Sequence, residues 1–193
     1  MKLKKWEIAL IIALAFTLLA GAKLSGEQQA LSDKLIRLHV VANSDSDADQ
    51  ALKLDVRDRI LEALTVKLGG VTERAAAVAV IEACLPEIET CAEEELRRQG
   101  YGYAVTAELA QEPFPTRDYD TFSLPAGVYE SLRVEIGDGT GRNWWCVVFP
   151  PICAETAMDA SPAMSALTDE EVSLITEDSA RYEIGRASCR ERV

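Results

Sequence analysis

The sequence predicts an α+β fold in a single domain, with two helices packed on a mainly antiparallel sheet. An apolar, β-branched run over residues 36–42 is followed by two long stretches whose apolar residues recur at helical spacing. Short alternating segments separated by Pro and Gly then fill the second half of the chain. The predicted order is therefore strand, helix, helix and then a meander of strands, which is typical of a two-layer α+β domain.

The first 22 residues have the pattern of an export signal. Three lysines near the start precede an apolar run over residues 8–22, which is shorter than the roughly 20 residues that span a bilayer comfortably. Small residues at 20–22 suit a signal peptidase. We therefore expect an exported protein; the alternative is an uncleaved N-terminal anchor. The polar residues 23–35 are expected to form a flexible stalk before the domain.

The first strand leads through a polar turn into a helix. Acidic residues in this turn suit the positive end of a helix, and Ser44 or Asp45 is the expected cap. The helix is predicted to run to Leu68, and Gly69-Gly70 ends it. Its apolar residues fall at every fourth position and form one stripe: Leu52, Val56, Ile60, Leu64 and Leu68.

A second helix is expected to begin at Thr72, whose hydroxyl can cap it, and to continue past Pro86 to Gly100. Strands are predicted over residues 104–110, 121–124, 131–136 and 145–149, and a weaker helix over residues 161–176. Pro113 and Pro115 are expected to end the first of these strands, because proline cannot donate to a ladder of hydrogen bonds.

The formal net charge of −12 narrows the class of partner. An acidic surface repels the phosphates of nucleic acids and the headgroups of anionic lipids. We therefore expect a partner that is a protein, with contact to the membrane only through the export signal.

No pattern of residues predicts catalysis, a metal or a cofactor. A calcium loop that starts at Asn43 or Asp45 lacks the glycine and the final glutamate that it would need. His39 is the only histidine, so a triad or a histidine metal site has little support, and a structural role is expected. Asp138-Gly139-Thr140 resembles an aspartic protease triplet, but it has no second copy and a hairpin turn explains it.

Three residues are the predicted contacts for a partner protein. Asn43 and Asp45 lie in the acidic turn, for which a solvated helix start is the alternative. Trp144 and Trp145 are adjacent, so on a strand they face opposite sides. We select Trp144, beside a glycine-rich turn, as the partner contact; the alternative is that it packs over the edge of the sheet.

The cysteines predict at most one disulfide in the domain. Cys146 and Cys153 flank Pro150-Pro151, which can turn the chain back, so we expect them to pair; free buried thiols are the alternative. Cys84 and Cys91 are seven residues apart on a predicted helix. That spacing is about 10 Å along the axis, too far for a bridge, so both are expected to be small core residues.

The last residues do not continue the pattern of the domain. Residues 184–193 back-translate in frame to a short-read sequencing adapter, and they have mixed charge without apolar periodicity. We therefore treat residues 183–193 as an artefact and expect the domain to occupy residues 36–182. Cys189 lies in this segment, so it is not counted among the cysteines of the domain.

Four blocks carry a resemblance to a known family: residues 36–60, 113–116, 124–130 and 139–153. In their order and content they resemble the stage II sporulation protein R family. The resemblance implies a signalling protein that is exported into the space between the forespore and mother-cell membranes. It implies that the protein activates a membrane-embedded aspartic protease of the mother cell, which then processes the precursor of the early mother-cell sigma factor. By this resemblance the chain is a ligand of the protease and not itself an enzyme.

Two other classes of function stay open from the residues alone. The chain could be a general interaction domain of the cell envelope. Gene disruption followed by scoring of the sporulation stage would distinguish this class from a sporulation signal. It could also be an exported hydrolase whose site the sequence does not reveal, which an active-site-directed probe would detect.

Overall fold

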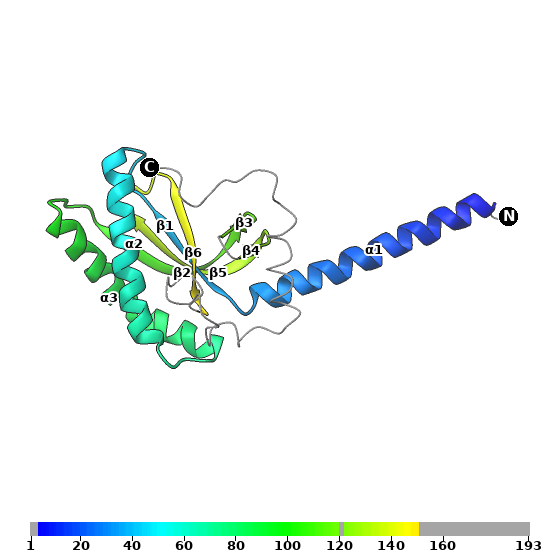
Figure 1. Ribbon diagram of the computed structural model, residues 1–193, viewed down its shortest axis with the longest axis horizontal. Coiled ribbons are helices and arrows are strands. Elements are labelled where there is room, and N and C mark those ends of the chain that lie inside the picture. Colours follow the sequence, from blue (N-terminus) through cyan, green and yellow to red (C-terminus); the bar gives the residue numbers. More distant parts are fainter. Residues whose placement is uncertain (1–3, 120–121, 151–193) are drawn as a thin grey trace.

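The computed structural model describes residues 4–119 and 122–150, and its elements follow the predicted order. In sequence they are α1 (Lys5–Ser32), β1 (Ile36–Val41), α2 (Asp47–Leu68), α3 (Arg74–Arg98), β2 (Val105–Phe114), β3 (Arg117–Asp118), β4 (Ser123–Leu124), β5 (Gly127–Ile136) and β6 (Asn143–Phe149). The two helices α2 and α3 lie together on one side of the main sheet, and β3 and β4 form a separate two-stranded sheet (Figure 1). The predicted α+β class is confirmed.

The main sheet has the strand order β2-β5-β1-β6, which differs from a simple meander. β1 lies between β5, to which it is parallel, and β6, to which it is antiparallel. β2 is antiparallel to β5 and forms one edge. The predicted meander is thus interrupted by the first strand. All six residues of β1 are buried, and an apolar strand of this kind gains most from a central place with neighbours on both sides.

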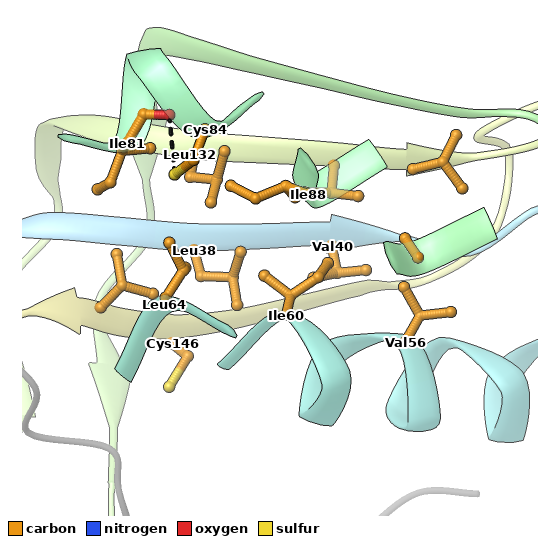
Figure 2. Close-up of a cluster of buried hydrophobic side chains, with 14 of the residues drawn as sticks. Leu38, Val40, Val56, Ile60, Leu64, Ile81, Cys84, Ile88, Leu132 and Cys146 are labelled. Carbon is orange, nitrogen blue, oxygen red and sulfur yellow. Dashed lines mark hydrogen bonds between the residues drawn. The ribbon is translucent and has the colours of Figure 1, made fainter. Parts of the chain in front are cut away.

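One face of the sheet and the two helices enclose the main hydrophobic core (Figure 2). The predicted stripe of α2, from Leu52 to Leu68, is buried along its whole length. α3 contributes residues at the same helical spacing: Ala77, Ile81, Cys84, Ile88, Ala92 and Leu96. From the sheet, Leu38, Val40 and Leu132 point into this layer. We call this side of the sheet the helical face.

Details of the helix ends and of one strand correct the sequence predictions. The cap of α2 is Ser46, whose hydroxyl accepts a hydrogen bond from the Asp49 N–H at 3.2 Å, and not Ser44 or Asp45. α3 begins after Glu73, which makes no side-chain cap, so Thr72 does not serve as predicted. β2 continues through Pro113. It can do so because β2 is an edge strand, where the missing N–H of proline breaks no second ladder.

The predicted flexible stalk over residues 23–35 is also corrected, because α1 continues without a break to Ser32. Leu31 and Leu35 are then buried against the far side of the sheet. Large apolar side chains between Trp6 and Leu19 are exposed, and α1 projects away from the domain (Figure 1). In the described ranges, no helix meets the combined length and hydropathy criteria for a transmembrane span.

A second, smaller cluster covers part of the opposite face of the sheet. Leu31, Leu35, Phe114, Phe122, Leu124, Tyr129 and Val147 form it. The short hairpin of β3 and β4 contributes Phe122 and Leu124, and β3 itself was missed from the sequence because it is only two residues long. We call this opposite side the polar face, since charged side chains occupy the rest of it.

Candidate functional site

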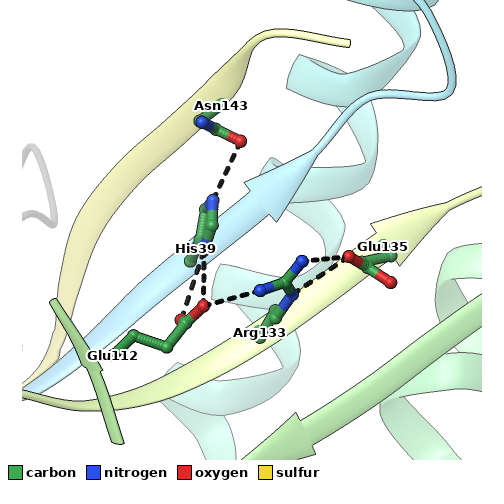
Figure 3. A network of polar contacts seen from close by, with 5 residues as sticks. All are labelled: His39, Glu112, Arg133, Glu135 and Asn143. Atoms are coloured by element: carbon green, nitrogen blue, oxygen red, sulfur yellow. Dashed lines mark hydrogen bonds and ion pairs between the residues drawn. The ribbon is translucent and has the colours of Figure 1, made fainter. Parts of the chain in front are cut away.

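The polar face carries a connected network of charged and polar side chains (Figure 3). His39 of β1 has its Nδ1 atom 3.2 Å from both carboxylate oxygens of Glu112 on β2. Arg133 of β5 donates from Nη1 to Glu112 at 2.9 Å and pairs on its other side with Glu135. The Nε2 atom of His39 lies 3.0 Å from the side-chain oxygen of Asn143 on β6. All four strands of the main sheet therefore contribute to one network.

The position of each side chain follows from the alternation of the strands. His39 lies on the same face of β1 as Arg37, while Leu38 and Val40 lie on the helical face. In the β2–β5 register, Glu112 pairs with Tyr129 and Glu108 with Arg133. Glu112 therefore lies four residues along β2 from the position opposite Arg133, and the two long side chains extend along the sheet to make their 2.9 Å contact.

Electrostatics favour the ionised form of Glu112. Burial alone would raise the pKa of this carboxyl group. Neighbouring Ser131, the charge and ring N–H of His39, and Arg133 outweigh burial and lower the pKa below its ordinary value. The Glu112 carboxylate accepts a hydrogen bond from Nδ1 of His39, and this contact fixes the orientation of the ring. The other ring nitrogen, Nε2, then faces the Asn143 amide, which can offer either its oxygen or its nitrogen.

Aromatic rings adjoin the network and connect it to two further arginines. Trp145 stacks on His39 with ring centroids 5.6 Å apart, and the guanidinium of Arg117 lies 3.9 Å from the centroid of Trp145. Phe114 meets both His39 and Trp145 edge to face. Arg37 lies over the ring of Phe114, with its guanidinium carbon 4.2 Å from the ring centroid.

The predicted contact residues Asn43 and Asp45 lie together, where the turn after β1 meets the turn between β5 and β6. The Asn43 side-chain oxygen accepts from the Asp138 N–H at 3.0 Å, and its backbone oxygen accepts from the Thr140 hydroxyl at 2.8 Å. Asp45 accepts from the Arg142 N–H at 2.7 Å. We call this junction of residues 43–49 with residues 137–142 the turn clasp. Its residues hold two distant parts of the chain together.

Close packing makes glycine necessary in the clasp. A Cβ atom added at Gly141 would lie 2.3 Å from the backbone oxygen of Ser44. A Cβ atom at Gly137, where φ is +60°, would lie 2.2 Å from the side-chain oxygen of Asn43. Both glycines are required by these approaches, so the glycine-rich turn is more than a flexible hairpin.

Two ionisable groups are buried in and beside the clasp. Asp49 accepts from the Asn43 amide at 2.9 Å and from the Ser44 hydroxyl at 2.5 Å. Burial opposes ionisation of Asp49, but hydrogen bonds from Ser44, Asn43 and Tyr103 prevail and lower its pKa. Lys53 of α2 donates to the Gln50 side chain at 2.7 Å and to the Arg142 carbonyl at 2.9 Å. Burial, followed by the nearby charge of Arg142, lowers the pKa of Lys53 to about 8.

Trp144 lies at the same end of the sheet but on the helical face. It is half-buried against the main core, and the guanidinium of Arg57 on α2 lies 4.4 Å from its ring centroid. Its indole N–H is buried without a hydrogen-bond partner. This is the packing alternative left open by the sequence, whereas Trp145 faces the polar side. Of the three predicted contacts, Asp45 is the most exposed, with 66% of its side-chain surface accessible.

The cysteine predictions are tested only in part. Cys146 is buried in the main core, while Cys153 lies outside the described residues, so their pairing stays a prediction. Cys84 is buried and Cys91 half-buried, and both are free thiols as expected. Burial is the main reason that the pKa of each of these two thiols is raised, which keeps them protonated and unreactive.

The polar face offers charged groups and hydrogen-bonding groups to a ligand or partner. The hydrogen-bond partners of His39 are the carboxylate of Glu112 and the amide of Asn143, so its ring is not paired with a serine, threonine or cysteine of the described residues as it would be in a nucleophile–histidine pair. Within residues 4–119 and 122–150, no group of three or more His, Cys, Asp or Glu side chains is placed to hold a metal ion. Arg37, Glu112 and Arg133 were missed from the sequence. The one available signal was Arg37, a charged residue inside a run that is apolar except for Arg37 and His39.

Comparison with known proteins connects these features to a family. The model of the family described as stage II sporulation protein R matches residues 32–159. The chain is also similar to Stage II sporulation protein R of Bacillus subtilis strain 168, with 36% identity over 158 residues, covering 76% of this chain and 70% of the relative. No solved structure matches.

Proposed function

Because the chain belongs to the stage II sporulation protein R family, we propose that it is an exported signal of endospore formation. It acts between the forespore and mother-cell membranes by binding a membrane-embedded aspartic protease of the mother cell. Binding activates that protease, which then processes the precursor of the early mother-cell sigma factor. The observation that carries this proposal is the 36% identity to a stage II sporulation protein R, together with the family match over residues 32–159.

The arrangement of the domain supports a role in binding over one in catalysis. The family-like blocks at residues 36–60 and 139–153 meet physically in the turn clasp, where Asn43 and Asp45 hold residues 138–142. Because Asn43 and Asp45 accept hydrogen bonds from this second segment, the acidic turn is held in one conformation. A rigid, acidic surface of this kind is pre-organised for a partner protein, because little conformational freedom is lost on binding.

Within this proposal, Asn43, Asp45 and Trp144 lie at or near the surface that meets the protease. All three lie where β1 ends and β6 begins, and the exposed carboxylate of Asp45 is the group most available to a partner. Asp45→Asn retains an oxygen that accepts the Arg142 N–H but removes the charge. We expect this variant to fold and to be exported, while cleavage of the sigma-factor precursor decreases.

The test scores precursor cleavage in sporulating cells whose own copy of the gene is deleted, at equal amounts of exported variant. Glu62→Gln is the matched control, since Glu62 is an exposed acid of α2 that pairs only with Arg59 among the described residues. Wild-type cleavage with both variants would place the protease contact on another surface. Deletion of residues 2–22 should abolish signalling by retaining the protein in the forespore; full activity without export would refute the proposed site of action.

A further inference from the structure

Arg37 is a charged side chain in an unusual environment. It has no exposed surface, although it lies on the polar face of the central strand. Its Nη2 atom donates to the hydroxyl of Tyr119 at 2.6 Å. Its Nε and Nη1 atoms are buried and have no hydrogen-bond partner. Since Nε carries one hydrogen and Nη1 two, three of the five N–H donors of this guanidinium have no acceptor.

The aromatic rings around Arg37 do not satisfy these donors. Phe114 and Tyr129 lie 4.2 Å and 5.0 Å from the guanidinium carbon and interact with the charge through their π faces. The N–H groups lie in the plane of the guanidinium and need acceptors there. A buried cation without a carboxylate is costly, and buried donors are normally paired. The environment of Arg37 therefore presents buried donors whose charge and geometry suit an anionic acceptor.

A second arginine belongs to the same region. The Nε atom of Arg117 is also buried without a partner, while its guanidinium lies against Trp145. Trp145 contacts Phe114, which in turn contacts Arg37, so one aromatic layer joins the two arginines. In the described part of the chain neither arginine forms an ion pair, although the chain has 32 acidic and 20 basic residues. Glu112, on the same face, is already engaged by His39 and Arg133.

We propose that Arg37 and Arg117 form a binding site for a carboxylate supplied by an acidic segment of a partner protein. Guanidinium groups bind carboxylates with strong, directional hydrogen bonds. Arg117 is only partly buried, so an incoming carboxylate meets it first. The carboxylate reaches Arg37 when the Tyr119 hydroxyl, which occupies one donor, moves aside. The use of this site in signalling rests on the proposed function, whereas the site itself is inferred from the contacts of this chain alone.

The direct test uses the full chain in mild detergent, with sodium acetate as the probe and sodium chloride at equal ionic strength as the reference. Thermal unfolding midpoints and the NMR signals of the arginine Nε–H groups are followed during titration. We expect acetate to raise the midpoint relative to chloride and to shift the Arg37 signal. Arg37→Met should lower acetate affinity at least about tenfold, because hydrogen bonds to charged groups are lost. Arg59→Met, which alters an exposed arginine of α2, should retain it.

Tyr119→Phe keeps the proposal testable if Arg37→Met does not fold. Removal of the hydroxyl releases the Nη2 donor, so acetate affinity should rise by about two- to fivefold. A purely structural tyrosine would instead lower the midpoint equally in both salts. Equal behaviour of acetate and chloride with wild type, or an acetate effect that persists in Arg37→Met, would overturn the site. Detection of a carboxylate from another part of this chain on Arg37 would equally exclude an external ligand. These readouts need no signalling assay, so failure of the site and failure of the proposed function are distinguishable.

Discussion

The two faces of the central sheet bury different kinds of side chain, and different interactions stabilise them. The helical face encloses a continuous layer of apolar residues from α2, α3 and the strands. The polar face combines a small aromatic cluster with buried or half-buried His39, Glu112, Arg133 and Arg37. Apolar burial is non-directional and tolerates small shifts, while hydrogen-bonded charges require fixed geometry. The helical face therefore supplies most of the stability, and the polar face supplies a shaped and charged surface.

One ionisable side chain on each side of the sheet, half-buried Glu112 and buried Lys53, shows the same difference between the two faces. Glu112, on the polar face, has hydrogen-bond donors around it that outweigh the effect of burial, and its pKa is lowered, so the ionised form is favoured. Lys53, beside the helical core, has an amide and a carbonyl as partners, and its pKa is lowered to about 8, so its ionised form is disfavoured. Both pKa values are lowered. For the acid Glu112 a lower pKa favours the charged form, whereas for the base Lys53 it favours the neutral form.

The largest effect is expected from removal of apolar volume on the helical face. Ile60→Ala should reduce the free energy of unfolding by about 2–5 kcal/mol, because Ile60 is fully buried between helix and sheet. Urea denaturation gives this quantity. Val66→Ala, on the same helix but 78% exposed, should change it by less than about 0.5 kcal/mol. Similar losses for the two variants would contradict the assignment of stability to this face.

On the polar face, Glu112→Gln should reduce the free energy of unfolding by about 1–3 kcal/mol at neutral pH, because His39 and Arg133 lose a charged acceptor. The pKa of Glu112 is lower in the folded state, so this contribution is present above its ordinary pKa of 4.5 and is lost as the pH falls below it. The difference between wild type and variant should therefore shrink in acid.

The control for that experiment is Glu108→Gln, an exposed residue of the same strand. It should give a much smaller difference in the free energy of unfolding at neutral pH. A pH-independent difference for Glu112→Gln would mean that the network stabilises the fold through shape and not through charge.

The smallest effect is expected from titration of Lys53. Its pKa is about 8 in the folded state and 10.5 ordinarily, so between these values the unfolded chain binds more protons and stability rises with pH. From pH 7 to 9 the wild type should gain about 1 kcal/mol relative to Lys53→Met. Lys67→Met, at an exposed lysine whose pKa is raised by Glu87, should show no such gain. If the free energy of unfolding had the same pH dependence in wild type and Lys53→Met, the buried ammonium group would not destabilise the folded state as we predict.

The helical face was predictable from the sequence because its signal is periodic. Apolar residues at every fourth position of α2 and the following Gly69-Gly70 defined both the buried stripe and the end of the helix. The strand order was not predictable, since β1 pairs with strands far along the chain. The continuous helix through Ser32 was also missed, because polar composition alone does not distinguish a solvated helix from a flexible segment.

The polar face was much harder to predict. A glutamate or arginine on a strand usually faces solvent, so Glu112 and Arg133 gave no sign that they meet His39. The roles of Trp144 and Trp145 depended on which side of β6 faced the helices, and a shift of one residue in register reverses them. The contacts of Asn43 and Asp45 with residues 138–142 depended on a junction between turns that local patterns do not encode.

The central place of β1 has a kinetic consequence. Residues Ile36–Val41 are made early, yet their partners Glu130–Glu135 and Asn143–Phe149 come about 90 to 110 residues later in the chain. Until those partners are available, the strand at the centre of the sheet has no ladder to join. Non-local pairing of this kind slows folding, because a long loop must close before any contact compensates for the lost chain entropy. The main sheet of a nascent chain therefore cannot be completed until β6 has emerged, and a chain without its sheet is in a form that can be threaded through a narrow channel.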